Sequence, residues 1–146
     1  MPAATFTHTV ATSASVNDAW TALQQPDTWA GIGPVSSVSD AEYASDGTLS
    51  AFRWVADLGG KAYHGTAETT LYQAPVRFEL NMDNSEIAGD VAATIEPADT
   101  GCSVTVEITF RTKGMLSAMF FPAIKTALAS GFPQQIEDLV AAIPTS

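Results

Sequence analysis

Histidine and cysteine are the side chains of this chain best suited to metal binding or nucleophilic chemistry, and they are few and dispersed. The histidines are His8 and His64, and Cys102 is the only cysteine. A metal site needs three or four ligands at suitable spacing, and these residues form no such cluster. Cys102 follows Gly101 beside an expected turn and has no neighbouring histidine to activate a thiolate. The sequence therefore predicts no metal site and no cysteine nucleophile.

Other catalytic patterns are equally weak. No serine has the strand–turn–helix context of a hydrolase nucleophile, and no glycine-rich loop has the spacing that holds phosphates. The acidic residues fall mostly on the outward faces of expected strands, so a pair of carboxylates for acid–base chemistry is not visible. We therefore expect no catalytic residue that the sequence can identify and no cofactor.

The histidines have different expected environments. His8 shares a strand face with Phe6 and Val10, so it can point inward. There it could act as a general base, or it could be a core or edge histidine bonded to the backbone. His64 lies on a polar strand face with Glu68, where a solvated pair is expected.

Composition and charge exclude several classes of protein. The chain has 146 residues, 46% hydrophobic and 15% charged, which predicts one domain over residues 1–146 without long disorder. The net charge is −10, and the six lysines and arginines are spread along the chain. Phosphate backbones and anionic membranes both need converging cations, so we expect neither nucleic-acid binding nor electrostatic membrane docking.

Targeting and spanning signals are also missing from the sequence. Residues 1–5 lack a basic region followed by an apolar run, so no secretory signal is expected. No apolar stretch reaches spanning length, so we expect no integral membrane segment and a cytoplasmic location. A lone cysteine excludes an internal disulfide.

The order of expected elements begins with a strand around residues 5–11 and a helix capped by Ser15. Pro26 stops that helix and opens a second short turn. Short turn sequences then separate further strands, which should pair antiparallel. The expected strands are residues 35–43, 48–58, 61–72, 76–84, 87–96 and 103–112. Most of these alternate apolar and polar residues, as in a sheet with one solvated face; in residues 61–72 the expected inward residues are Tyr63, Ala67 and Leu71.

The C-terminal region carries a continuous apolar stripe at three- and four-residue spacing, typical of a helix about 40 Å long. The stripe consists of Leu116, Phe120, Ile124, Leu128, Phe132, Ile136, Leu139 and Ile143. Pro122 and Pro133 remove backbone donors inside this helix, and the run Gly131-Phe132-Pro133 should kink or break it. Since neither helix nor sheet can bury its apolar face alone, the helix must lie across the sheet.

The region from Ala14 to Trp29 resembles the first-helix signature of the START-like or SRPBCC superfamily. It has a small-residue turn, a helix with Trp20, Leu23 three positions later, and Pro26 opening a second short helix. The resemblance implies the α+β helix-grip fold: a curved antiparallel seven-stranded sheet wrapped around a long C-terminal helix, with two short helices after the first strand. It also implies a hydrophobic cavity between sheet and helix.

The chain departs from two branches of that superfamily. Residues 44–48 are too short and glycine-poor to match the glycine-rich loop of the pollen-allergen branch. Polyketide cyclases usually set polar side chains into the cavity, whereas the inward faces here are almost wholly apolar.

Apolar residues on the inward faces are the candidate ligand site, and they either line a pocket or fill a packed core. The candidates are Trp54, Tyr63, Phe78, Met82, Phe110, Phe120 and Ile124. The small residues Gly65, Ala67, Gly89 and Ala93 should leave space between them.

The leading hypothesis is a binding or carrier protein for a hydrophobic small molecule such as a lipid, quinone or polyketide. One alternative is a polyketide cyclase or dehydratase that uses His8 or Tyr63 as general acid or base. Another is a protein-interaction module without a ligand. Met115, Met119, Phe120 and Phe121 form an apolar cluster that could be a ligand portal, the contact of a homodimer, or core.

Overall fold

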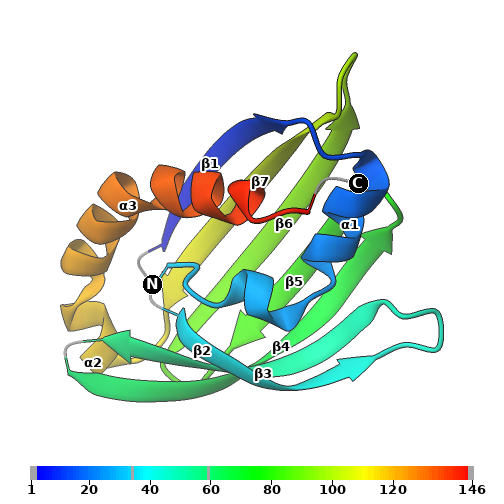
Figure 1. The fold of residues 1–146 in the computed structure, drawn as a ribbon. Coiled ribbons are helices and arrows are strands. Elements are labelled where there is room, and N and C mark those ends of the chain that lie inside the picture. The colour runs from blue at the N-terminus through cyan, green and yellow to red at the C-terminus, as the bar shows by residue number, and fades with distance from the viewer. Residues whose placement is uncertain (1–2, 34, 59, 145–146) are drawn as a thin grey trace.

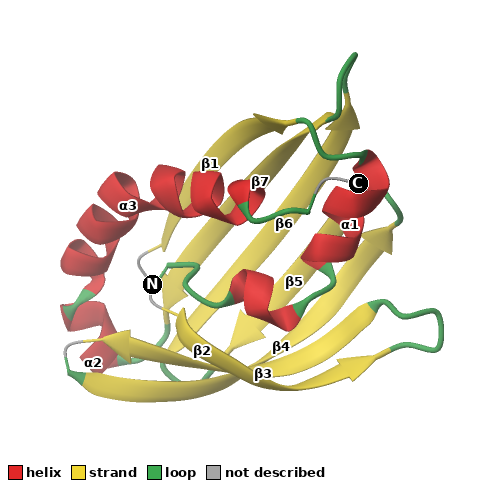
Figure 2. Ribbon diagram, viewed as in Figure 1, coloured by secondary structure: helices red, strands yellow, loops and turns green. Residues whose placement is uncertain are grey.

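The structure is a computed structural model that describes residues 3–33, 35–58 and 60–144. In these residues seven antiparallel strands form one sheet in the order β1-β7-β6-β5-β4-β3-β2 (Figure 1). The strands are β1 (Ala3–Thr12), β2 (Val35–Tyr43), β3 (Leu49–Leu58), β4 (Lys61–Gln73), β5 (Arg77–Asp83), β6 (Ile87–Pro97) and β7 (Cys102–Thr112). The helices are α1 (Val16–Leu23), the 3-10 helix η1 (Pro26–Trp29), α2 (Met115–Met119) and α3 (Phe121–Ala141). The curved sheet and the long C-terminal helix confirm the predicted helix-grip fold (Figure 2).

The sheet has the expected division into a buried and a solvated face. Along β5 and β7 the buried residues alternate with more exposed ones, as an antiparallel sheet covered on one side requires. One prediction fails in β4, where the register shifts between Thr69 and Leu71. Because one extra residue reverses the alternation, Leu71 pairs with Glu79 on the outer face and not with an inward residue.

The connection from β1 to β2 is held by local hydrogen bonds. The Ser15 hydroxyl accepts from the backbone amide of Asp18 at 3.0 Å and so caps α1. The Trp29 indole Nε1 donates to the carbonyl of Leu23 at 3.0 Å, which ties η1 back to the end of α1. This connection leads into the residues that cover one end of the concave face.

The C-terminal helix differs in one respect from the predicted stripe. The chain forms the short helix α2 and then α3, which starts at Phe121 with Pro122 in its first turn. Proline lacks the amide hydrogen that a continuous helix would need there, and inside a helix its ring would clash with the carbonyl four residues earlier. Pro133, by contrast, lies inside α3 without ending it, and α3 bends as it passes over the sheet (Figure 1).

The buried face of α3 follows the predicted four-residue spacing. Its buried residues are Ile124, Leu128, Phe132 and Ile136, as predicted, and Val140, which takes the place expected for the half-buried Leu139. The ring of Phe132 lies 6.3 Å from that of Phe6 in β1. The helix therefore packs chiefly on the β1 edge of the concave face, where β1 and β7 are neighbours.

Candidate functional site

A small apolar cavity lies on the concave face of the sheet, with a volume of about 30 Å³. Its lining residues are Ile32, Val35, Trp54, Ala56, Met82, Ile87, Ala88, Gly89, Ile108 and Phe110. None of them carries a charge, so the lining can make dispersion contacts with an apolar molecule. This volume would hold about two water molecules, whereas ligand pockets usually measure roughly 300–1,000 Å³. A ligand must therefore displace side chains or a covering segment to enter.

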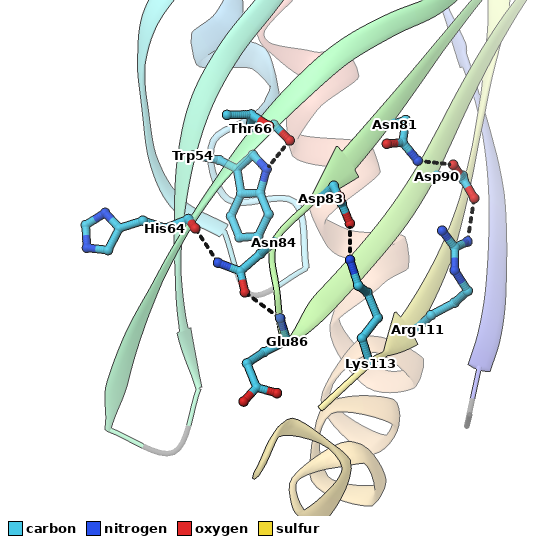
Figure 3. A network of polar contacts seen from close by, with 10 residues as sticks. All are labelled: Trp54, His64, Thr66, Asn81, Asp83, Asn84, Glu86, Asp90, Arg111 and Lys113. Carbon is cyan, nitrogen blue, oxygen red and sulfur yellow. Dashed lines mark hydrogen bonds and ion pairs between the residues drawn. The ribbon is translucent and has the colours of Figure 1, made fainter. Parts of the chain in front are cut away.

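Trp54 fills much of the space beside this cavity. Its indole Nε1 donates to the carbonyl of Thr66 at 2.9 Å, which lays the ring across β4 (Figure 3). A Cβ at Gly65 would lie 2.2 Å from Trp54 Cζ2, so the ring rests on the glycine. The space expected from Gly65 is thus occupied by tryptophan, while Gly89 does line the cavity.

The structure divides the predicted ligand-site residues into separate groups. Trp54, Met82 and Phe110 come together in the cavity wall. Phe78 lies apart in an aromatic cluster, with ring centroids 5.9 Å from Trp20 and 6.2 Å from Trp29.

The remaining candidates lie outside the lining of the cavity. Tyr63 is only 3% exposed and pairs in the sheet with the lining residue Ala56. Ile124 is buried on α3, and Phe120 is half-buried at the start of that helix.

Several lining residues were not predicted from the sequence. Ile108 shares the inward face of β7 with Phe110, so the alternation pattern was sufficient to find it. Ile32 lies in the loop after η1, between two glycines, where no periodic pattern exists. Ile87 and Ala88 begin β6 after a turn, and their place beside Trp54 depends on how the sheet curves.

The loop that carries Ile32 is fastened to α3 by one side chain. Gln135 Oε1 accepts from the amide of Gly33 at 3.1 Å, and Gln135 Nε2 donates to the Gly33 carbonyl at 3.4 Å. A Cβ at Gly33 would lie 3.2 Å from Leu128 Cδ2, so the loop also packs closely on the helix. Ile32 and Val35 flank this attachment and cover the cavity.

The residues considered for chemistry stay apart. His8 is half-buried on β1 opposite Val106, and the exposed His64 side chain points away from the cavity (Figure 3). Cys102 is buried, its Sγ lies 3.4 Å from the Ala14 carbonyl, and burial raises the pKa of the thiol. A protonated, covered thiol is a poor nucleophile. In the described ranges no three histidine, cysteine or acidic side chains are placed to hold a metal ion.

The solvated face of the sheet is organised by ion pairs. Asp90 on β6 accepts from Arg111 on β7 and, at 2.9 Å, from Asn81 on β5 (Figure 3). Partial burial acts to raise the pKa of Asp90, but the hydrogen bonds from Arg111 and Asn81 outweigh it, and the pKa lies below its ordinary value. Lys113 similarly pairs with Asp83 at 2.7 Å. The contacts of Asp90 link adjacent strands, and the Lys113–Asp83 pair joins the residue after β7 to β5 across β6.

The most exposed large apolar side chains in the described residues lie on α2: Met115 is 88% exposed and Met119 75% exposed. Phe121 instead stacks on Phe110, with ring centroids 6.2 Å apart. Of the predicted cluster, Met115 and Met119 therefore face solvent, whereas Phe121 packs on the core. Of the helices in the described residues, none combines the length and apolarity needed to cross a membrane.

Comparison with known proteins identifies the family. Residues 3–144 match the family described as polyketide cyclase / dehydrase and lipid transport. The chain therefore belongs to this family and to the SRPBCC superfamily that the first-helix signature resembled. The comparison with curated proteins gives no match.

Solved structures support the same fold at low sequence identity. A START superfamily protein from Mycobacterium smegmatis is 13% identical, with a TM-score of 0.62 over 94% of this chain and 98% of that one. The Zhui aromatase/cyclase from Streptomyces sp. R1128 is 14% identical, with a TM-score of 0.66 over 92% of each chain. The di-domain ARO/CYC BexL from the BE-7585A biosynthetic pathway is 18% identical, with a TM-score of 0.67 over 99% of this chain and 51% of its own length. At these identities the similarity establishes the fold and not the chemistry.

Proposed function

We propose that this protein binds or carries a hydrophobic small molecule, of the lipid, quinone or polyketide type, on the concave face of its sheet. The observation that carries this proposal is the lining of the cavity, which consists of uncharged, apolar residues from β2, β3, β5, β6, β7 and the loop before β2. An apolar ligand gains free energy from such a wall, at about 25 cal/mol for each Å² removed from water. The family description, which includes lipid transport, supports the same class of ligand.

Entry of a ligand requires the cavity to expand, and the structure offers a route. The covering loop is attached to α3 through the neutral hydrogen bonds of Gln135 and through apolar contacts. Neutral hydrogen bonds of this kind contribute only about 0.5–1.5 kcal/mol each. Displacement of this loop, together with rotation of Met82 or Trp54, would join the cavity to the surrounding concave face. We therefore place Trp54, Tyr63, Met82, Phe110 and Ile124 in the expanded site, with Phe78 and Phe120 at its two ends.

The first test is mass spectrometry of organic extracts from gently purified protein, followed by titration with the neutral fluorescent probe N-phenyl-1-naphthylamine. We expect a co-purifying apolar compound or saturable probe binding. The variant Ala56→Leu fills the cavity and should weaken probe binding about tenfold or more, since Ala56 is fully buried in the wall. Ala127→Leu on the exposed face of α3 adds the same atoms elsewhere and should leave binding unchanged.

The proposal is wrong if the extract is clean and the probe fails to bind the folded wild-type protein. The proposed position of the site is wrong if Ala56→Leu and Ala127→Leu bind the probe equally well. Circular dichroism and chemical unfolding of both variants establish that each is folded before binding is compared.

A cyclase or dehydratase activity is the second candidate. It is favoured by the Tyr63 hydroxyl, which is a buried proton donor and acceptor on the concave face, and by the similarity of the fold to aromatase/cyclases. Turnover of an aromatic polyketide that is lost in Tyr63→Phe or His8→Ala, with ligand binding retained, would support it. If the wild-type protein binds such a compound but does not convert it, the enzyme candidate is ruled out and the carrier function is retained.

A further inference from the structure

One buried hydroxyl on the concave face is unusual because it lacks a hydrogen-bond partner. Tyr63 is 3% exposed, and its Oη has no partner in the part of the chain that the structure describes. Leaving a buried hydroxyl unpaired costs roughly 1–3 kcal/mol, so native proteins keep few such groups. The indole nitrogens of Trp29 and Trp54, by contrast, are buried donors that pair with backbone carbonyls. In the described residues, the side chains of Gln24 and Thr112 also carry a buried donor without a partner, but only Tyr63 and Thr112 pair in the sheet with residues that line the cavity.

The position of Tyr63 connects it to the cavity. Tyr63 on β4 pairs with Ala56 on β3, which in turn pairs with Val35 on β2, and both partners line the cavity. Paired residues share one face of a sheet, so Tyr63 continues the row that forms the wall. The ammonium of Lys61 lies 5.1 Å from the centroid of the Tyr63 ring and helps to hold the ring in place.

A second buried hydroxyl supports the polar character of this end of the concave face. Thr112 is fully buried on β7, and its Oγ1 likewise has no partner in the described residues. It pairs with Ile87 and lies two residues beyond Phe110, both of which line the cavity. Two hydroxyls thus border a wall that is otherwise apolar.

We propose that Tyr63 is the polar anchor of the site and that the ligand is an apolar ring compound with a carbonyl oxygen. Tyr63 Oη donates a hydrogen bond to that oxygen, and the apolar wall takes the hydrocarbon body. This proposal rests on the function proposed above. The neighbouring Lys61 contacts the face of the ring, and Oη has no hydrogen-bond partner in the described residues. A purely hydrocarbon ligand would leave the hydroxyl unpaired and would bind less tightly.

A matched pair of probes tests the anchor separately from the site. 9-Fluorenone and fluorene have nearly the same shape and differ by a carbonyl in place of a methylene. We expect wild-type protein to bind fluorenone about three- to tenfold more tightly, the range that one net hydrogen bond provides. Tyr63→Phe should reduce this preference to about one while leaving the affinity for fluorene unchanged. Tyr72→Phe, at a tyrosine that is 47% exposed, should leave the preference intact.

The outcomes separate this proposal from the one it rests on. Failure of both probes to bind overturns the proposed function and the anchor with it. Equal binding of both probes to wild-type protein, or an unchanged preference in Tyr63→Phe, overturns the anchor alone.

Stability of the ligand-free protein provides an independent readout. If Oη has no partner, Tyr63→Phe removes a polar group that burial penalises, so the midpoint of urea unfolding should stay the same or rise. Tyr72→Phe should leave the midpoint unchanged. A clear fall of the midpoint in Tyr63→Phe alone would mean that the hydroxyl is bonded within the protein, and the anchor would be wrong.

Discussion

At the scale of single residues, the fit between Gly65 and Trp54 determines how much of the concave face is open. The indole lies where a side chain at residue 65 would stand, and its Nε1 is fixed to the Thr66 carbonyl. Only glycine permits this approach, because a Cβ would also lie 2.5 Å from the carbonyl of Asp83. Gly65 was expected to leave open space because it has no side chain. Instead, the indole of Trp54 occupies that space.

Changing glycine to alanine should have opposite effects on stability at Gly65, which contacts Trp54, and at Gly131, which has open space around it. Gly65→Ala should lower the free energy of unfolding by about 2–3 kcal/mol, because neither the ring nor the backbone can yield without strain. Gly131→Ala in α3 meets no atom within 4 Å and should raise stability by about 0.5–1 kcal/mol through helix propensity. Urea unfolding measures both. Equal stability of Gly65→Ala and wild type would show that Trp54 moves freely, and tryptophan fluorescence would report that movement.

At the scale of elements, the loop that carries the lining residue Ile32 is attached to α3. Gln135 is the polar side chain that joins them, and it contacts both backbone groups of Gly33. The neighbouring Gln134 is exposed and donates instead to Asp138 one turn later, at 2.8 Å. Adjacent glutamines on one helix thus have different partners, and of the two Gln135 is the one bonded to the loop.

The attachment of the loop to α3 predicts different rates of ligand uptake when alanine replaces each of these two glutamines. Gln135→Ala should speed the uptake of N-phenyl-1-naphthylamine severalfold in stopped-flow fluorescence, because it removes the hydrogen bonds that close the loop. Gln134→Ala should leave the uptake rate unchanged while removing a comparable amide. The same rate in both variants would contradict opening at this loop and would favour entry beside α2.

At the scale of the whole molecule, charge is concentrated on the outside of a nearly neutral interior. The chain carries a net charge of −10, yet the cavity is lined without any ionisable group. The arginines and Lys113 of the outer face are each paired with a carboxylate, and the Asp90–Arg111 pair joins β6 to β7. Acid should therefore weaken the sheet from its solvated face.

The lowered pKa of Asp90 gives the sign of this effect. A carboxyl whose pKa is lower when folded stabilises the protein above its unfolded pKa, near 4, and that stabilisation is lost as the pH falls through the folded pKa. Asp90→Asn should therefore lower stability at pH 7 by a few tenths to about 1 kcal/mol, since the pair is partly exposed. The difference from wild type should shrink below about pH 4. Asp99→Asn, in the exposed turn after β6, is the control, and parallel curves for Asp90→Asn and wild type down to pH 2 would contradict the prediction.

Local patterns were enough to predict most of the elements. The two-residue alternation and the turn sequences located the strands to within a residue or two of their observed bounds, and the four-residue spacing found Ile124, Leu128, Phe132 and Ile136 on α3. The exceptions were Leu71, which the shift in β4 turns outward, and the separation of α2 from α3 before Pro122. The shift in β4 and the separation of the two helices each depend on the backbone geometry of one residue, which the spacing of apolar residues cannot predict.

The sequence by itself determined the curved sheet, the long helix and the apolar character of the face between them, since these follow from the period at which apolar residues recur. Only the tertiary structure decided how much of that face is empty. The indole of Trp54 over Gly65, the return of Ile32 and Val35 over the cavity, and the unpaired hydroxyl of Tyr63 all bring together residues from separate elements. Free volume and hydrogen-bond pairing depend on side-chain rotamers and on neighbours distant in the chain, because a packed interior leaves room for few alternatives.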